Sequence, residues 1–320
     1  MPRGLPALRG RVARGRGFLS ALAAAWLLAG CNAMAPAPSG GTDDTPRIAV
    51  ISAFEPELAL LLPRVEGAKQ QRINGVEFTT GTLEGKAVVV FLSGISMTNA
   101  AMNTQLVLDR FRVSRIVFSG IAGGVNPALH IGDVTVPAQW GQYLEAVLAR
   151  ETARTRFTPP PWMKDATLPG FGMLMPRPVE VRTAAQPAPT RKAWFEADPQ
   201  MLETARRLGN VELARCTAAA TCLSHRPQVV VGGNGVSGQA FVDNTAFRQY
   251  TYKTFKANVL DMETAATAMV AYSNNVPFIA FRSLSDLAGG GEGENEMGTF
   301  MSLAADNSAK VLLAFLAAWQ

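Results

Sequence analysis

The order of predicted strands and helices along the chain indicates a single α/β domain. Short apolar strands alternate with helices, and the clearest unit is 258–291, which reads as strand, helix and strand. The first strand of this unit runs into Asp261 and Glu263, and the second ends at Asp286. Ligands of an open parallel sheet bind outside the carboxyl ends of its strands, so we expect Glu263 and Asp286 to face a ligand. The length of 320 residues, 48% of them hydrophobic, suits one large domain or two small ones.

The first thirty residues have the composition of an export signal. Five arginines precede an apolar stretch, 18–28, that is too short to span a membrane as a mature helix. The segment 28–31 (LAGC) resembles a bacterial lipobox, which implies cleavage before Cys31 and a lipid on its sulfur. The resemblance implies a protein anchored at the membrane and facing the periplasm, and Asn32 favours the outer membrane. A plain secretory signal with an incidental cysteine is the alternative.

Removal of segment 1–30 changes the charge of the protein. The formal net charge of +5 includes five arginines and no acid from this segment, so 25 basic and 25 acidic residues remain. The basic composition therefore does not indicate nucleic-acid binding. Residues 31–46 are rich in Pro, Ala, Gly and Ser and predict a flexible linker, which places the domain at 47–320. No later segment is predicted to be long and apolar enough to cross a membrane.

Two cysteines remain after Cys31, and they lie six residues apart. Cys216 and Cys222 are predicted to form a local disulfide in an oxidising compartment. Metal binding is the alternative, with His225 as the nearby imidazole. Because His130 and His225 are the only histidines, we predict neither a metal nor an organic cofactor, and we expect His130 at the surface.

The first half of the domain is predicted to begin with a strand and a helix. Strands are expected at 47–52, 76–83, 86–92 and 115–118, and a helix at 98–111. The segment 131–137 is expected to be a turn into another strand. Pro56 suits the first turn of a helix, which places Glu57 at a helix N-terminus just after a strand. The alternative for Glu57 is an acid that only complements the helix dipole. The glycine-rich segment 119–124 is predicted to be a turn that a ligand can approach closely, with tight packing as the alternative.

The second half is less regular. We interpret 141–197 as loops and short strands that wall a site. Helices are expected at 199–208, 264–272 and 299–319, strands at 229–231 and 278–284, and a flexible acidic loop at 288–298. Phe241, which follows a strand and a glycine pair, is a candidate stacking platform, with a core position as the alternative.

Short motifs follow one another in the order found in the nucleoside phosphorylase superfamily. They are 53–57 (AFEPE), 93–95 (SGI), 120–124 (GIAGG) with 132–134 (GDV), 240–242 (AFV), 261–263 (DME) and 285–288 (SDLA). The pattern resembles 5′-methylthioadenosine/S-adenosylhomocysteine nucleosidase, and the tail is also similar to the plant bark-storage-protein branch. The resemblance covers 47–137 and 228–318. It implies a three-layer αβα sandwich with a central mixed sheet, of the phosphorylase/hydrolase type, and a homodimer.

The resemblance implies roles for individual residues. Asp286 would protonate purine N7 so that the base leaves as a neutral group, and Glu57 would hold and polarise the attacking water. Glu263 would bind the ribose hydroxyls, and Phe241 would stack on the base. The other implied binding positions are Met262, Val242, Ile95, Ala122 and Gly123. These residue types suit the chemistry, because carboxylates stabilise an oxocarbenium-like sugar and a buried carboxyl group with a raised pKa can protonate a leaving base.

Water is favoured over phosphate as the nucleophile. Phosphorylases of the superfamily hold phosphate with arginine and Gly/Ser turns, whereas 120–124 contains no arginine and Glu57 would repel an anion. Arg282 is expected to be a structural partner of Asp261 or of a neighbour, with a phosphate role as the alternative.

We therefore predict a purine nucleosidase, that is, an N-glycosyl hydrolase. A phosphate-dependent purine nucleoside phosphorylase and a catalytically weak nucleoside-binding or storage-like protein are the alternatives. The three carboxylates argue against a pure binder, which needs no acid and base on opposite sides of a bond. Gly289 stands where nucleosidases often carry a second acid, so the sequence does not specify the 5′ substituent.

Overall fold

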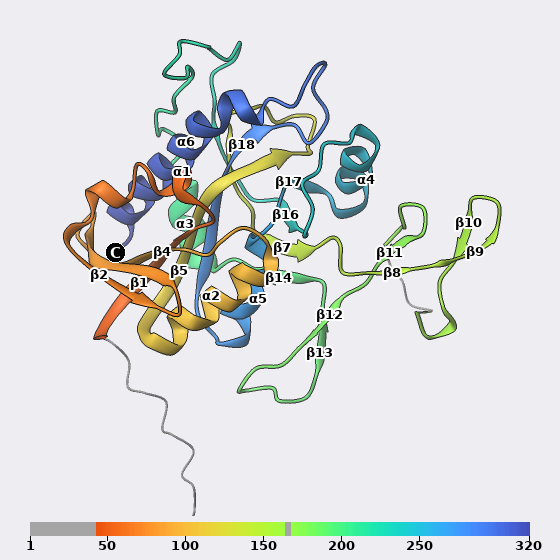
Figure 1. Cartoon of the computed structure of the whole chain (residues 1–320), viewed down its shortest axis with the longest axis horizontal. Coiled ribbons are helices and arrows are strands. Elements are labelled where there is room, and N and C mark those ends of the chain that lie inside the picture. The colour runs from red at the N-terminus through yellow and green to blue at the C-terminus, as the bar shows by residue number, and fades with distance from the viewer. Residues whose placement is uncertain (1–42, 164–167) are drawn as a thin grey trace, which may run out of the picture. The chain divides into compact units, whose positions relative to one another are not determined.

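A central mixed sheet of twelve strands lies in the computed structural model, which describes residues 43–163 and 168–320 (Figure 1). Its main path runs in the order β14 (Trp194–Glu196), β7 (Gln139–Gln142), β16 (Asn234–Ser237), β17 (Ala257–Asp261), β5 (Phe111–Gly124), β1 (Asp43–Ser52), β4 (Lys86–Leu92), β3 (Val76–Leu83) and β2 (Glu66–Ile73). Strand β18 (Phe278–Asp286) also pairs with β5, and β6 (Val134–Val136) pairs with β18 and β15 (Val229–Val231). Parallel pairs such as β1–β5 occur beside antiparallel pairs such as β3–β4. The predicted mixed sheet is confirmed.

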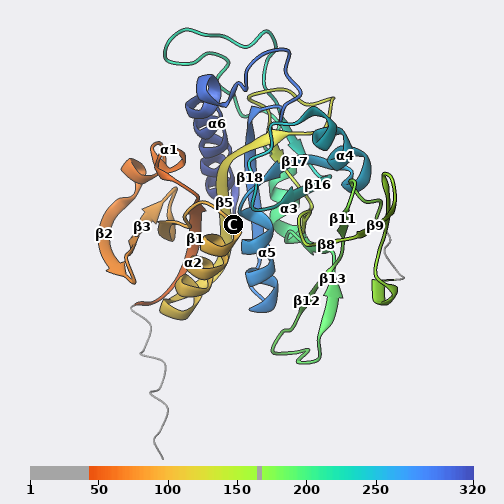
Figure 2. The same ribbon diagram turned by 45° about the vertical axis from the view of Figure 1, so that its right-hand side comes forward.

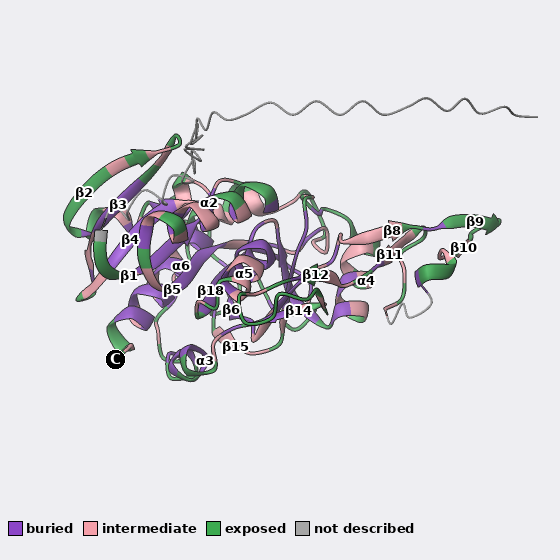
Figure 3. Ribbon diagram, turned by 90° about the horizontal axis from the view of Figure 1, so that it is seen from below, coloured by how far each residue is buried: buried purple, intermediate pink, exposed green. Residues whose placement is uncertain are grey.

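Helices cover both faces of this sheet (Figures 1 and 2). One face carries α2 (Met97–Arg110) and α5 (Thr264–Ser273), and the other carries α1 (Glu55–Leu58), α3 (Pro199–Arg206) and α6 (Met297–Ala318). Side chains of a strand point alternately to opposite faces. In β1, Val50 therefore packs in the core under α3 and α6, whereas Ile51 packs in the core under α2 and α5. Strand β18 is the longest of the strands in which every residue is buried (Figure 3).

Several boundaries differ from the sequence prediction because backbone pairing extends strands beyond their apolar residues. Residues 43–46 belong to β1 and not to the predicted linker. The glycine-rich segment 119–124 is not a turn: it is the end of β5, where it pairs with β18 and β17. The sequence analysis also does not predict β2, β16 and α4 (Thr245–Phe255). Most residues of β2 are exposed, so this strand has no apolar pattern to reveal it.

The predictions about membranes have two different outcomes. The signal peptide, the lipidation at Cys31 and residues 31–42 of the linker lie outside the described residues. Within them, α6 is the one helix that is long and apolar enough to cross a bilayer by length and composition, so the prediction that no such segment follows is wrong. Most of α6 is buried against β18 and β5, as in the core helix of a sandwich.

The described residues of 146–192 form three small two-stranded sheets, and none of them lines the pocket that the acids build. The pairs are β8 (Ala146–Leu148) with β11 (Leu174–Pro176), β9 (Arg150–Ala153) with β10 (Arg156–Thr158), and β12 (Val179–Val181) with β13 (Thr190–Lys192). The 3₁₀ turns are η1 (Leu62–Arg64) and η2 (Pro161–Met163). Described residues of 141–197 line a separate cavity of about 130 Å³ beside Trp162 and Trp194. This cavity is separate from the acids because β7 and β14 lie at one end of the sheet, several strands away from β5.

A disulfide joins Cys216 and Cys222 in the loop between α3 and β15. Their sulfur atoms are bonded to each other, and the metal-binding alternative is not what the structure contains. His225 lies nearby, with Nε2 3.0 Å from the carbonyl oxygen of Ile131. The ring of His130 packs against that of His225, with 4.7 Å between centroids, and its side chain is exposed as expected.

Candidate active site

A pocket of about 180 Å³ lies where β1, β5, β17 and β18 end. The structure brings together in its lining all nine residues that the sequence analysis assigns to catalysis and substrate binding. They are Glu57, Ile95, Ala122, Gly123, Phe241, Val242, Met262, Glu263 and Asp286. The lining also contains residues that the analysis did not select, namely Ala53, Phe54, Ile121, Ala240, Leu260, Asp261, Ser285 and Met297.

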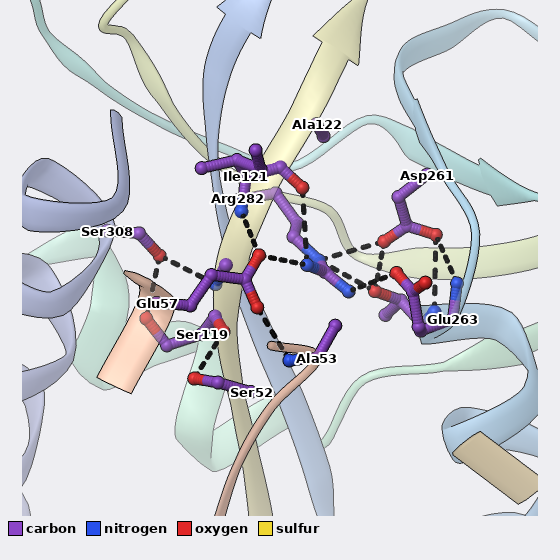
Figure 4. Close-up of polar contacts among 12 residues, drawn as sticks. Ser52, Ala53, Glu57, Ser119, Ile121, Ala122, Asp261, Glu263, Arg282 and Ser308 are labelled. Atoms are coloured by element: carbon purple, nitrogen blue, oxygen red, sulfur yellow. Dashed lines mark hydrogen bonds and ion pairs between the residues drawn. The ribbon is translucent and has the colours of Figure 1, made fainter. Parts of the chain in front are cut away.

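Arg282 organises the acids on one side of this pocket (Figure 4). It is fully buried in β18, and its guanidinium group lies 4.2 Å from the ring centre of Phe118. Gly120 of β5 is paired in register with Arg282. A Cβ atom at this glycine would lie 2.1 Å from Arg282 Nη1 and 2.4 Å from Glu57 Oε1. The glycine of β5 therefore makes room for the guanidinium group and for the carboxylate that it meets.

Glu57 is held by backbone N–H groups as well as by the guanidinium group. Its Oε2 accepts a hydrogen bond of 2.6 Å from the Ala53 N–H, and its Oε1 accepts one of 2.8 Å from the Ile121 N–H. Arg282 Nη1 lies 3.5 Å from Oε1. Burial raises the pKa of Glu57, and Arg282 and the backbone donors oppose this increase. The contacts with two other strands show that Glu57 does more than complement the dipole of its own short helix.

Asp261 and Glu263 occupy the other side of the same guanidinium group (Figure 4). Arg282 Nε lies 2.8 Å from Asp261 Oδ2, which confirms the predicted pairing, and Nη2 lies 3.5 Å from Glu263 Oε2. Asp261 Oδ1 also accepts hydrogen bonds from the backbone N–H groups of Glu263 and Thr264, at the start of α5. Glu263 Oε1 accepts one of 2.9 Å from the Ser96 N–H. Three carboxylates thus share one buried cation.

The protonation of Glu263 should make stability depend on pH. Burial raises its pKa from 4.5 to about 7, although Arg282 lowers it. A raised pKa stabilises the fold below pH 4.5, and this stabilisation is lost as the pH rises toward 7. We expect this contribution of Glu263 to the free energy of unfolding to decrease by about 3 kcal/mol over that pH range. Urea unfolding of the wild type and of Glu263→Gln from pH 5 to 8 measures it. A difference in unfolding free energy between the two that does not change with pH would contradict the assignment.

Asp286 has a different environment, because it is not among the carboxylates paired with Arg282. Its Oδ1 accepts a hydrogen bond of 2.8 Å from the Ala288 N–H, and its Oδ2 accepts one of 2.9 Å from the Ser285 hydroxyl. Burial raises the pKa of Asp286, while the donors of Ala288, Ser285 and Asn295 lower it. A carboxyl group with this balance can carry a proton and release it to a ligand.

The apolar part of the pocket has an exposed aromatic ring at its mouth. Phe241 is 56% exposed and Ile95 is 51% exposed, which is unusual for side chains of this size. Val242 and Ala122, by contrast, are buried in the wall. An exposed ring beside buried acids suits a flat ligand that stacks on it. Among the described residues that line the pocket, none is Lys, Arg or His.

The sequence matches the family model of the phosphorylase superfamily over residues 47–317. The chain belongs to the phosphorylase superfamily. Within it, the chain is 30% identical to the 5′-methylthioadenosine/S-adenosylhomocysteine nucleosidase of Geobacillus kaustophilus, over 84% of this chain and 96% of the relative. It is 29% identical to the nucleosidase of the same name from Bacillus licheniformis, over 84% and 98% of the two chains.

Solved structures of this superfamily have the same fold. The nucleosidase of Neisseria meningitidis, in complex with methylthio-immucillin-A, superposes with a TM-score of 0.62 at 25% identity. The match covers 85% of this chain and 99% of that one. The predicted family and fold are confirmed.

Arg282 is the site residue that the sequence analysis underestimated. The sequence predicts a single acid as its partner, whereas in the structure Arg282 lies between three. Its position in an otherwise apolar strand, 278–284, is the available signal, because a charge buried in a sheet requires partners. Nothing in the sequence indicates that residues 53, 96 and 121 supply backbone N–H groups to Glu57 and Glu263.

Proposed function

We propose that this protein hydrolyses the N-ribosidic bond of a purine nucleoside of the methylthioadenosine or S-adenosylhomocysteine type. One observation carries the proposal: the pocket holds carboxylates in two different environments. Glu57 and Glu263 are paired with Arg282, whereas Asp286 is held only by neutral donors. Titratable groups whose environments differ in this way are suited to opposite roles as base and acid. The named relatives support the same reaction.

Each acid has a distinct role in this mechanism. Asp286 donates its proton to purine N7, so that the base departs as a neutral group. Glu57 accepts a proton from the water that attacks the sugar. Arg282 does not line the pocket and acts through the two glutamates, because its guanidinium nitrogens lie 3.5 Å from the carboxylate oxygens of Glu57 and Glu263. Glu263 accepts hydrogen bonds from the ribose hydroxyls, and its charge stabilises the positive charge that develops on the sugar.

Water suits this pocket better than phosphate does. Arg282, the cation that holds the acids, is shared by three carboxylates, and no basic residue is among the described lining. A phosphate dianion would therefore meet net negative charge. A phosphorylase remains the second candidate only if phosphate proves necessary for turnover.

Base release tests the proposal directly. A soluble form that begins at Asn32 is incubated with methylthioadenosine, S-adenosylhomocysteine, adenosine or inosine, with and without phosphate. We expect phosphate-independent release of the base. Release only with phosphate would reassign the protein as a phosphorylase and leave Glu57 without its role. Adenine binding without release from any substrate would support the binding-protein alternative.

We also propose export and lipid anchoring, which rest on segment 1–31 of the sequence alone. In cells that express the full chain, labelled palmitate should be incorporated into the protein and lost in Cys31→Ser. The wild type should fractionate with membranes, preferably the outer membrane. A wild-type protein that is soluble and unlabelled would reject the anchor.

A homodimer is proposed for the soluble domain. Four large apolar side chains that are exposed in the chain belong to β8, to η2 and to the residues just before β11, namely Leu148, Trp162, Phe171 and Met173. Exposed apolar side chains of this size in one region of the sequence favour an interaction surface there. Sedimentation equilibrium should give twice the monomer mass, and Leu148→Asp should lower it. A monomeric wild type at micromolar concentration would reject the dimer.

A further inference from the structure

The loop that follows Asp286, residues 287–297 and here called the acid loop, is attached to the segment that starts at Asp243. The Asn244 N–H donates a hydrogen bond of 3.2 Å to the carbonyl oxygen of Ala288. The Thr245 hydroxyl donates a hydrogen bond to the carbonyl oxygen of Gly289. Gly289 has a φ of +83°, and a Cβ atom there would lie 2.3 Å from the Asn244 nitrogen. This close approach and the positive φ explain why a glycine occupies this position.

Asn295 makes the contact at the far end of the acid loop. Its Nδ2 donates a hydrogen bond of 3.1 Å to Asp243 Oδ1, and its Oδ1 accepts one of 3.0 Å from the Met297 N–H. The second bond fixes the orientation of the amide, because the oxygen accepts from the Met297 N–H and the NH₂ group is the donor toward Asp243. That group has two hydrogens. One is donated to Asp243, and the amide also acts as a donor that lowers the pKa of Asp286.

Asp243 and Asp286 each stand beside residues that line the pocket. Asp243 directly follows Phe241 and Val242, and Asp286 is the proposed acid. Met297, whose N–H orients the amide, lines the same pocket. We propose that Asn295 is a positioning residue for Asp286, which holds the acid loop against Asp243 and so fixes the acid relative to the stacking ring. The inference rests on the proposed function and adds a residue to it.

Kinetics of Asn295→Ala test this role. We expect kcat to fall roughly tenfold, the effect of losing one hydrogen bond to a charged group. The pH profile separates positioning from mere support of the loop. Since the Asn295 donor lowers the pKa of Asp286, its removal should raise that pKa and move the alkaline limb of kcat to higher pH. Asn295→Asp should lose more activity because it adds a third negative charge. Glu294→Gln, an exposed neighbour, should stay within about twofold of the wild type.

Proteolysis provides a measurement that does not require turnover. Glu292 and Glu294 are exposed on the acid loop, so a protease that cleaves after glutamate should cut the native Asn295→Ala variant faster than the wild type. Thermal unfolding of both proteins confirms that the variant is folded. If the wild type releases no base, the proposed function fails, and faster cleavage still supports the loop contact. Unchanged kcat and pH profile in an active enzyme would overturn the proposal, as would unchanged cleavage in an inactive one.

Discussion

Asp286→Asn should reduce kcat for base release about a thousandfold, within the range that general acids contribute. The amide has no proton to give to purine N7 at neutral pH, so the base would have to leave as an anion. The fold should tolerate the change. In the variant, the amide oxygen can still accept a hydrogen bond from the Ala288 N–H. In the wild type the Ser285 hydroxyl donates to Asp286 Oδ2, and in the variant this hydroxyl can instead accept a hydrogen bond from the amide nitrogen. Release of adenine from methylthioadenosine at substrate saturation is the measurement.

The matched control is Asp109→Asn, which makes the same chemical change on the exposed surface of α2. It should retain wild-type activity. Adenine binding to Asp286→Asn, measured by calorimetry, should persist because Phe241 and the pocket wall are unchanged. An Asp286→Asn enzyme that keeps more than about a tenth of the wild-type kcat would exclude Asp286 as the general acid.

The sequence predicts the site well where a residue type and a strand end coincide. Asp286 and Glu263 follow β18 and β17, and topology brings both strand ends to one pocket. Glu57 is located by Pro56 and by the resemblance of its motif. Phe241 was ambiguous between a stacking platform and a core residue, and its 56% exposure at the pocket mouth decides for an open position.

The parts that the sequence does not predict depend on distant backbone or on unpatterned segments. The extension of β5 through Gly124 follows from pairing with β18 and β17, which no local propensity encodes. The small sheets of 146–192 have short strands and mixed exposure, so their place away from the pocket cannot be derived from periodicity. The helix α6 is apolar because it is a core helix, which composition alone does not distinguish from a membrane span.

Arg282→Met should destabilise the fold by about 3–5 kcal/mol at pH 8, the effect of removing one partner from a buried ion pair. Methionine fills much of the space, but it leaves Glu57, Asp261 and Glu263 without their shared cation. The activity should also fall on the order of a hundredfold, because the base and the ribose ligand lose their fixed positions. Urea unfolding and base release measure the two effects.

The pH dependence distinguishes this explanation from a simple packing defect. Arg282 lowers the pKa of both Glu57 and Glu263, so its removal should raise these pKa values further. The stability deficit of the variant should therefore be largest at pH 8 and shrink toward pH 5, where the carboxyl groups can be protonated. Arg206→Met, which breaks the exposed pair with Glu203, should cost less than about 1 kcal/mol at either pH. A deficit that is equal at pH 5 and pH 8 would mean that Arg282 contributes volume to the core and not charge to the three acids.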